Sequence, residues 1–145
     1  MVLLRHSKIK IGEATDVAKV FQDLLSLEDK IDRDKEHFYV MHVDARQQVN
    51  LVELVAIGTL THAEVHPRET YRRAVIEGSH SIIVAHNHPT GDVMPSEADI
   101  KATQQLHKAG EILQILLLDH IIFTAQGDTF FSFKDNKQMS IQAHG

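Results

Sequence analysis

The chain has 145 residues, of which 43% are hydrophobic and 24% charged, and these proportions describe an ordinary globular domain and exclude an intrinsically disordered chain. It has no cysteine, which excludes disulfides and thiolate metal sites, so that a metal ion could be held only by histidine and carboxylate side chains. The formal net charge of −5 argues against a general phosphate-binding surface, which would need clustered lysine and arginine.

The first half of the chain predicts an arm, a helix and a hairpin. Residues 1–14 are expected to form a peripheral arm. Apolar residues recur at helical spacing in TDVAKVFQDLLSLEDKI, which predicts a helix over residues 15–31. Segments 37–44 and 50–58 alternate as strands do, and DARQQ between them is typical of a turn, so we expect a hairpin.

The second half predicts two helices and three strands. The helices are predicted over residues 66–78 and 96–110, the second closed by Gly110. The strands are predicted over residues 81–86, 112–124 and 129–133, and the polar tail after Lys134 is expected to be peripheral. Hairpins and helices in this order indicate an α+β sandwich around one central sheet.

The sequence favours a cytoplasmic protein without a membrane segment. Its first residues contain no long apolar region and no small-residue cleavage site, so we predict no signal peptide. The most apolar stretch, ILQILLLDHIIF, is too short to span a bilayer and is interrupted by Asp119 and His120.

The segment HNHPTGDVMPSEAD, residues 86–99, carries most of the candidate chemistry. His86 and His88 leave the end of a predicted buried strand, where residues two apart face the same side. Asp99 follows in the first turn of the next predicted helix. Two neutral imidazoles and a carboxylate form a three-ligand set for zinc, with a fourth position left for water whose pKa would fall to about 7. A nearby glutamate would then transfer the proton.

A purely structural interpretation of the same segment remains open. Ser96 and Asp99 have the spacing of a capping box, with Asp99 in place of the usual glutamate. His86 could be a core histidine and His88 a surface one. Joint placement favours the metal, because the histidines close a buried strand and the third ligand opens the next helix. Capping and metal binding can coexist through different atoms.

AHNHPTGDVMPSEAD closely resembles the JAMM (JAB/MPN-type) metal motif, in the version found in the RadC family. The segments GTLTHAEVHPRETYRRAV, KEHFYVMHVD and LLDHIIF resemble the same family, so that the likeness covers about residues 15–133. The resemblance implies a single RadC-like JAB/MPN domain over residues 1–145. It also implies a cytidine-deaminase-like α/β/α sandwich with a mixed sheet and a zinc ion at the end of a strand.

The resemblance also implies roles for individual residues. His86, His88 and Asp99 would be the zinc ligands, and Ser96 would orient the water or stabilise an oxyanion. Glu36, just before the first strand of the sheet, would be the general base.

Glu53 is the alternative base, because an acid inside an apolar strand calls for a partner or a role. Asp119 and His120 interrupt another apolar strand, and they are expected to be a buried structural pair or partners of the ligands.

Three functions follow, in order of preference. The first is a zinc hydrolase that cleaves a peptide or isopeptide bond in a peptide or protein substrate. The second is a metal-dependent nuclease or phosphodiesterase in DNA metabolism, in which Arg68, Arg72 and Arg73 would hold the phosphate. The third is a non-catalytic module associated with DNA repair, the label the RadC family traditionally carries. Direct nucleic-acid binding is disfavoured by the acidic charge and by the lack of the helix-hairpin-helix region that many RadC proteins have.

Overall fold

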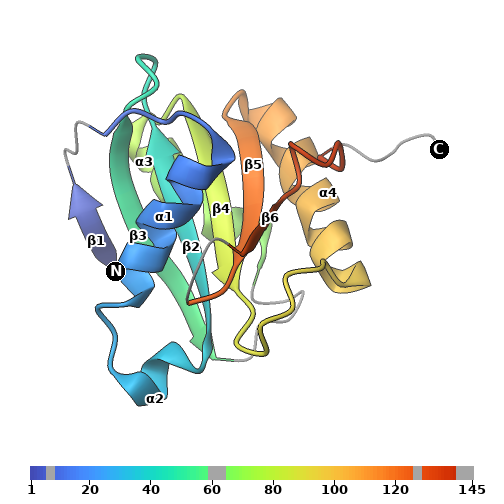
Figure 1. Ribbon diagram of the computed structural model, residues 1–145. Coiled ribbons are helices and arrows are strands. Elements are labelled where there is room, and N and C mark those ends of the chain that lie inside the picture. The colour runs from blue at the N-terminus through green and yellow to red at the C-terminus, as the bar shows by residue number, and fades with distance from the viewer. Residues whose placement is uncertain (6–8, 59–64, 126–128, 140–145) are drawn as a thin grey trace.

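The computed structural model describes residues 1–5, 9–58, 65–125 and 129–139 (Figure 1). Its helices are α1 (Ala14–Leu25), α2 (Lys30–Arg33), α3 (Pro67–Glu77) and α4 (Glu97–Leu113). Its strands are β1 (Val2–Arg5), β2 (Glu36–Val43), β3 (Val49–Gly58), β4 (Ser81–Asn87), β5 (Leu116–Phe123) and β6 (Phe130–Ser132). Of the family-like segment GTLTHAEVHPRETYRRAV, residues 59–64 lie outside the described part.

The strands form one mixed sheet in the order β1-β3-β2-β4-β5-β6. The predicted hairpin is confirmed, since β2 and β3 pair antiparallel. Strands β4 and β5 are parallel neighbours, and α4 makes the crossover between them. The other neighbouring pairs are antiparallel.

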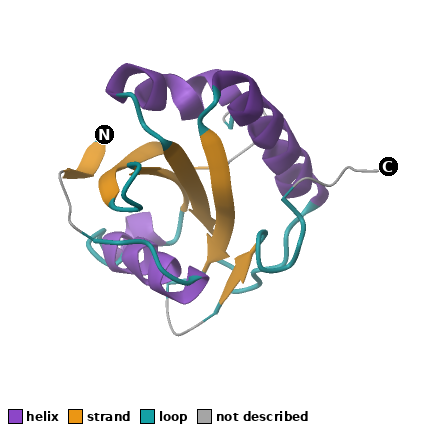
Figure 2. Cartoon of the chain, turned by 90° about the horizontal axis from the view of Figure 1, so that it is seen from above, coloured by secondary structure: helices purple, strands orange, loops and turns teal. Residues whose placement is uncertain are grey.

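Helices cover both faces of the sheet, which confirms the expected α/β/α sandwich (Figure 2). On one face, α1 buries Val17, Phe21 and Leu25 against side chains such as Tyr39 and Ile121. On the other face, α3 and α4 pack over β2, β4 and β5, and the core there contains Phe38, Val84, Tyr71 and Leu106. Each strand therefore sends alternate residues to opposite helical layers.

The predicted end of α4 is wrong. The helix continues through Gly110 to Leu113 and ends at Gln114, whose φ of 60° is left-handed, so that β5 begins only at Leu116. Glycine is required at position 110 by lack of space and not by the end of the helix. A Cβ there would collide with the hydroxyl of Tyr71 and the carbonyl oxygen of Ile115.

The N-terminal prediction also needs correction. Part of the expected arm is β1, which extends the sheet by pairing with β3. The predicted helix over residues 15–31 divides in two, because α1 ends at Leu25 and Asp29 caps a new helix by accepting the Asp32 N–H at 2.9 Å. Within the described ranges, no helix combines the length and apolar character needed to cross a membrane.

Candidate metal centre

The end of β4 places the two histidines. His86 is the penultimate residue of the strand and is only 3% exposed. The N–H of His88 donates to the carbonyl oxygen of Phe123 at 2.9 Å, which continues the pairing with β5 one residue past the strand. Because the backbone stays extended, His86 and His88 face the layer that contains α4.

The beginning of α4 places the carboxylate. Ser96 is the N-cap, and its Oγ accepts the Asp99 N–H at 3.1 Å, while its own N–H donates to Asp99 Oδ2 at 2.9 Å. This reciprocal pair is a capping box with aspartate in the third position. The predicted cap is therefore present, and it orients the carboxylate of Asp99 toward the end of β4.

Three ligand atoms converge between these elements. The Nε2 atoms of His86 and His88 are 3.0 Å apart, and they lie 3.3 and 3.4 Å from the two carboxylate oxygens of Asp99. A tetrahedral zinc ion with ligand bonds of about 2.0–2.2 Å keeps its ligand atoms roughly 3.4 Å apart. In the described part of the chain, these residues are the one group of histidines and acids that could hold a metal ion.

A chain of hydrogen bonds fixes the tautomer of His86. The carbonyl oxygen of Asp99 can only accept, so Thr103 Oγ1 donates to it at 2.7 Å and accepts from His120 Nδ1 at 2.6 Å. His120 is then protonated on Nδ1, and its Nε2 accepts from His86 Nδ1 at 2.9 Å. Burial, with the charge of His86 next, lowers the pKa of His120 well below its ordinary value and keeps it neutral. The free lone pair of His86 is therefore on Nε2, facing the site.

The second histidine is oriented in the same way. His88 Nδ1 donates to the carbonyl oxygen of Asp92 at 2.7 Å, which leaves its Nε2 lone pair directed at the other two ligands. Two lone pairs and a carboxylate repel one another unless a proton or a cation lies between them. The donor set and its fixed tautomers therefore fit a zinc ion.

Electrostatics at the site favour the same arrangement. Burial opposes ionisation of Asp99, but in the metal-free protein Nε2 protons on His86 and His88, which a bound metal ion would displace, hydrogen-bond to its carboxylate and hold the pKa far below the usual range. The hydrogen bond with Asp99 raises the pKa of His88, although burial acts against it. The carboxylate is thus ionised at every physiological pH and available to a cation.

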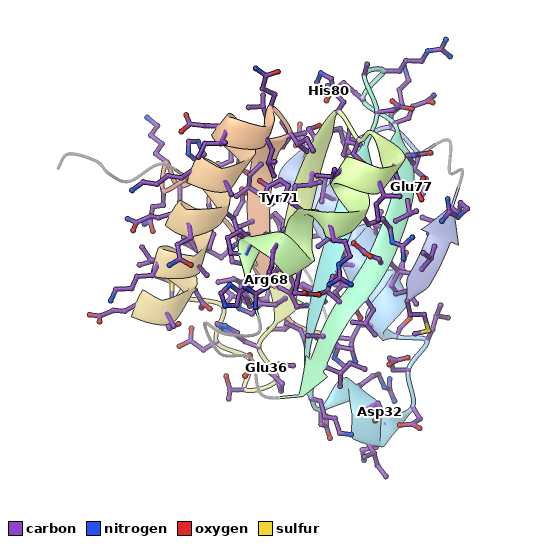
Figure 3. All side chains as sticks on the ribbon, turned by 180° about the vertical axis from the view of Figure 1, so that it is seen from behind. Asp32, Glu36, Arg68, Tyr71, Glu77 and His80 are labelled. Atoms are coloured by element: carbon purple, nitrogen blue, oxygen red, sulfur yellow. The ribbon has the colours of Figure 1, made fainter. Side chains whose placement is uncertain are left out.

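Glu36 lies at the same end of the sheet (Figure 3). Antiparallel pairing sets Phe38 opposite His86, so Glu36, two residues earlier in β2, lies at the end of the sheet that carries His88. Its negative charge contributes to the raised pKa of His88. The side chain is half-buried, so it remains open to a bound substrate or water.

Glu53 lies farther from the end of the sheet, and its carboxylate already contacts His42 and Arg73. It faces Val40, four residues farther along β2 than Glu36, or about 13 Å at the usual rise of a strand. Its two carboxylate oxygens contact His42 Nε2 at 3.2 Å and Arg73 Nε at 2.8 Å. Burial opposes ionisation of Glu53, but these two partners lower the pKa of its carboxyl below the usual value.

Comparisons with known proteins identify the family of this chain. A family model described as the RadC-like JAB domain matches residues 11–139. The chain belongs to the RadC family. A UPF0758 protein of Chlorobaculum tepidum is 42% identical over 132 residues, which are 91% of this chain and 56% of the relative.

Other relatives carry the same family designation. A UPF0758 protein of Chlorobium chlorochromatii is 48% identical over 72% of this chain and 46% of its own length. One from Staphylococcus epidermidis is 42% identical over 86% of this chain and 52% of its own length. This RadC-family chain thus spans about half the length of the curated relatives that it matches.

The two polar residues of β5 that interrupt its apolar sequence, Asp119 and His120, are both held by hydrogen bonds in this RadC-like domain. His120 orients a ligand, as one of the two predictions for it stated. Asp119 is structural, because its carboxylate accepts from Ser132 Oγ at 2.6 Å and from the N–H groups of His120 and Lys134 at 2.7 and 3.0 Å. Burial raises the pKa of Asp119 despite these bonds.

Thr103 was missed at the level of sequence. It lies one helical turn after Asp99, on the face of α4 that meets β5. That i, i+4 spacing was the available signal, but threonine in a helix is usually unremarkable.

Proposed function

We propose that this RadC-family chain is a zinc-dependent hydrolase of the JAMM type that cleaves a peptide or isopeptide bond. The observation that carries the proposal is the convergence of two histidine lone pairs, with fixed tautomers, on the ionised carboxylate of Asp99. Zinc is favoured over harder cations because the donor set contains two imidazoles. When bound, zinc supplies a Lewis acid and makes water nucleophilic near neutral pH.

Glu36 supplies the proton transfer in this proposal. It is two residues before Phe38, which pairs with His86, and among the described residues no ion pair joins it to an arginine, in contrast to Glu53. Its carboxylate takes a proton from the attacking water and passes it to the departing amine. Glu53 is therefore the weaker of the two candidates for the general base.

Ser96 supplies a hydrogen bond beside the ligands. Its Oγ accepts the Asp99 N–H, and its own hydroxyl hydrogen remains available to donate to a substrate carbonyl oxygen. The backbone of α4 holds this hydroxyl in place through the capping box, so it needs no rearrangement to stabilise the negative oxygen of a transition state.

A nuclease is less well supported. Arg73 is paired with Glu53 and Arg72 with Glu69, so only Arg68 of the three helix arginines lacks a carboxylate partner among the described residues. Phosphodiester cleavage also tends to use a second metal ion, for which the described ranges contain no further ligand group. A non-catalytic role is disfavoured because the ligand set is complete and oriented.

Metal analysis and hydrolysis assays test the proposal. Purified protein should contain about one zinc per chain, and His88→Ala should lose it. Zinc-loaded protein should hydrolyse members of a peptide and isopeptide panel but not single-stranded DNA. Glu36→Gln should retain zinc and lose activity by a factor of at least about 100, whereas Glu53→Gln should retain activity. Equal metal in wild type and His88→Ala, or cleavage of DNA alone, would reject the proposal.

A further inference from the structure

A small pocket adjoins the candidate metal centre at the end of β4. It has a volume of about 200 Å³, and its walls include Lys30 and Arg33 from α2 and His88 and Pro89 from the loop after β4. Figure 1 shows α2 and this loop at the same end of the sheet. Because His88 is a wall of the pocket and also a candidate metal ligand, anything that fills the pocket lies next to the metal centre.

The pocket contains two cations that the described residues do not neutralise. Lys30 and Arg33 are three positions apart in α2 and therefore share a side of the helix. No ion pair joins either of them to a carboxylate in the described part of the chain, and the buried Nε of Arg33 has no hydrogen-bond acceptor there. A buried N–H without an acceptor is unfavourable unless a ligand completes it.

Most of the acidic residues near α2 interact with groups other than Lys30 and Arg33. Asp29 caps the helix through the Asp32 N–H, and Asp32 forms an ion pair with Lys35 at 3.1 Å. Of the acids in the described part of the chain, Asp34 alone lines the pocket, and it is exposed. Among the described residues, two cations therefore face one solvated carboxylate, which gives this lining a net positive charge before any metal binds.

We propose that the pocket formed by Lys30, Arg33 and His88 is a subsite that selects substrates with a carboxylate on the residue beside the scissile bond. This inference rests on the proposed peptidase function, for which it specifies the substrate class. The carboxylate belongs to an aspartate or glutamate side chain or to a free C-terminus. A guanidinium binds a carboxylate with two parallel hydrogen bonds, and the ammonium of Lys30 adds a second charge.

A carboxylate suits the pocket better than a phosphate. Asp34 lines the pocket, and it repels a ligand with two negative charges more strongly than a ligand with one. A singly charged carboxylate is repelled less by Asp34 and can still accept hydrogen bonds from the guanidinium of Arg33. The volume of about 200 Å³ also accommodates one short side chain.

Binding can be measured without catalysis. NMR titration of ¹⁵N-labelled protein, with and without zinc, would use three probes: N-acetylglutamate α-amide, N-acetylglycine and inorganic phosphate. N-acetylglutamine α-amide is the uncharged reference. We expect at least one of the carboxylates to bind both forms of the protein, and Arg33→Gln to raise its Kd about tenfold, the usual effect of losing a charge-assisted hydrogen bond. The first two probes distinguish a side-chain carboxylate from a C-terminal one.

Two further variants separate the pocket from general charge effects. Arg46→Gln removes the same charge from the β2–β3 turn, at the opposite end of β2 from Glu36, and should leave the Kd unchanged. Arg33→Lys should restore part of the affinity. Carboxylate binding that requires zinc and ignores Arg33→Gln would overturn the inference. Tighter Arg33-dependent binding of phosphate would overturn it too, in favour of a phosphodiester substrate.

Hydrolysis then separates the inference from the function on which it rests. With paired peptides that differ only by glutamate or glutamine beside the cleaved bond, kcat/KM should favour glutamate about tenfold, and Arg33→Gln should abolish that preference. If both peptides are cleaved equally well by the wild type, the inference is wrong and the peptidase stands. If no peptide is cleaved although Arg33-dependent binding persists, both the proposed peptidase function and the proposed substrate class are wrong, and the pocket is only an anion-binding site.

Discussion

Replacement of Thr103 by valine tests whether the hydrogen-bond chain behind His86 prepares the metal site. Valine has nearly the same shape as threonine but cannot donate to the Asp99 carbonyl oxygen or accept from His120 Nδ1. His120 is buried and then keeps an N–H with no acceptor, or moves its proton to Nε2. The second outcome forces His86 to carry its own proton on Nε2, the atom that faces the metal.

Both outcomes have an expected magnitude. An unsatisfied buried N–H lowers the free energy of unfolding by about 1–3 kcal/mol. Loss of a hydrogen bond behind a metal-ligating histidine usually weakens metal binding by roughly 10- to 100-fold, which corresponds to about 1.4–2.7 kcal/mol. We therefore expect Thr103→Val to raise the Kd for zinc by at least about tenfold and to destabilise the metal-free protein.

Thr70 provides a matched control in α3. Its side chain is also buried, but its Oγ1 has no hydrogen-bond partner among the described residues. Thr70→Val should therefore leave zinc affinity unchanged and change stability by less than about 0.5 kcal/mol, or increase it. The assays are competition with a chromophoric zinc chelator and urea unfolding of the metal-free protein. A folded Thr103→Val variant that binds zinc within twofold of the wild type would refute the reasoning.

Three further changes have defined outcomes. In the metal-free protein, the pKa of Asp99 is lowered and the pKa of His88 is raised. Their interaction therefore stabilises the fold above the unfolded pKa of aspartate, 3.8, and weakens once the pH rises past the raised pKa of His88. In urea unfolding, Asp99→Asn should lower the free energy of unfolding more at pH 5.5 than at pH 9. Gly110→Ala should lower the free energy of unfolding by about 1–3 kcal/mol and lower it less in a Tyr71→Phe background, because the new methyl group meets the Tyr71 hydroxyl. Glu53→Gln should lower the free energy of unfolding by about 1–3 kcal/mol and leave the zinc content unchanged, because the Glu53 carboxylate forms buried ion pairs away from the metal site. Loss of zinc in this variant would contradict a purely structural role for Glu53.

The convergence of His86, His88 and Asp99 was predictable because its information is local. Two histidines at the end of a strand and an acid in the next helical turn can be placed by the periodicities of strands and helices alone. Strands β2, β3, β4 and β6 were predictable for the same reason, since alternation and turn residues are short-range signals, whereas β1 and the start of β5 were not.

What could not be predicted depends on contacts across the sheet. Glu36 and Glu53 both lie in strands, and only the pairing of β2 with its neighbours shows that Glu36 lies near the end of β4 whereas Glu53 faces Val40. Gly110 resembled a helix end because its real constraint, the hydroxyl of Tyr71, comes from another helix. The pocket beside α2 was missed since its cations lie more than fifty positions before His88 in the chain.

The capping box and the candidate metal centre share Asp99, so the two interpretations of the sequence do not compete. Asp99 Oδ2 accepts the N–H of Ser96, while its Oδ1 faces His86 at 3.3 Å. The first turn of α4 therefore cannot form in this way without directing a carboxylate at the end of β4. Because the helix makes its cap whether or not metal is present, the carboxylate is in position before the ion arrives, and binding needs little reorganisation. This coupling explains an aspartate in place of the longer glutamate of the usual capping box, since the shorter side chain keeps both oxygens close to the helix and the strand end.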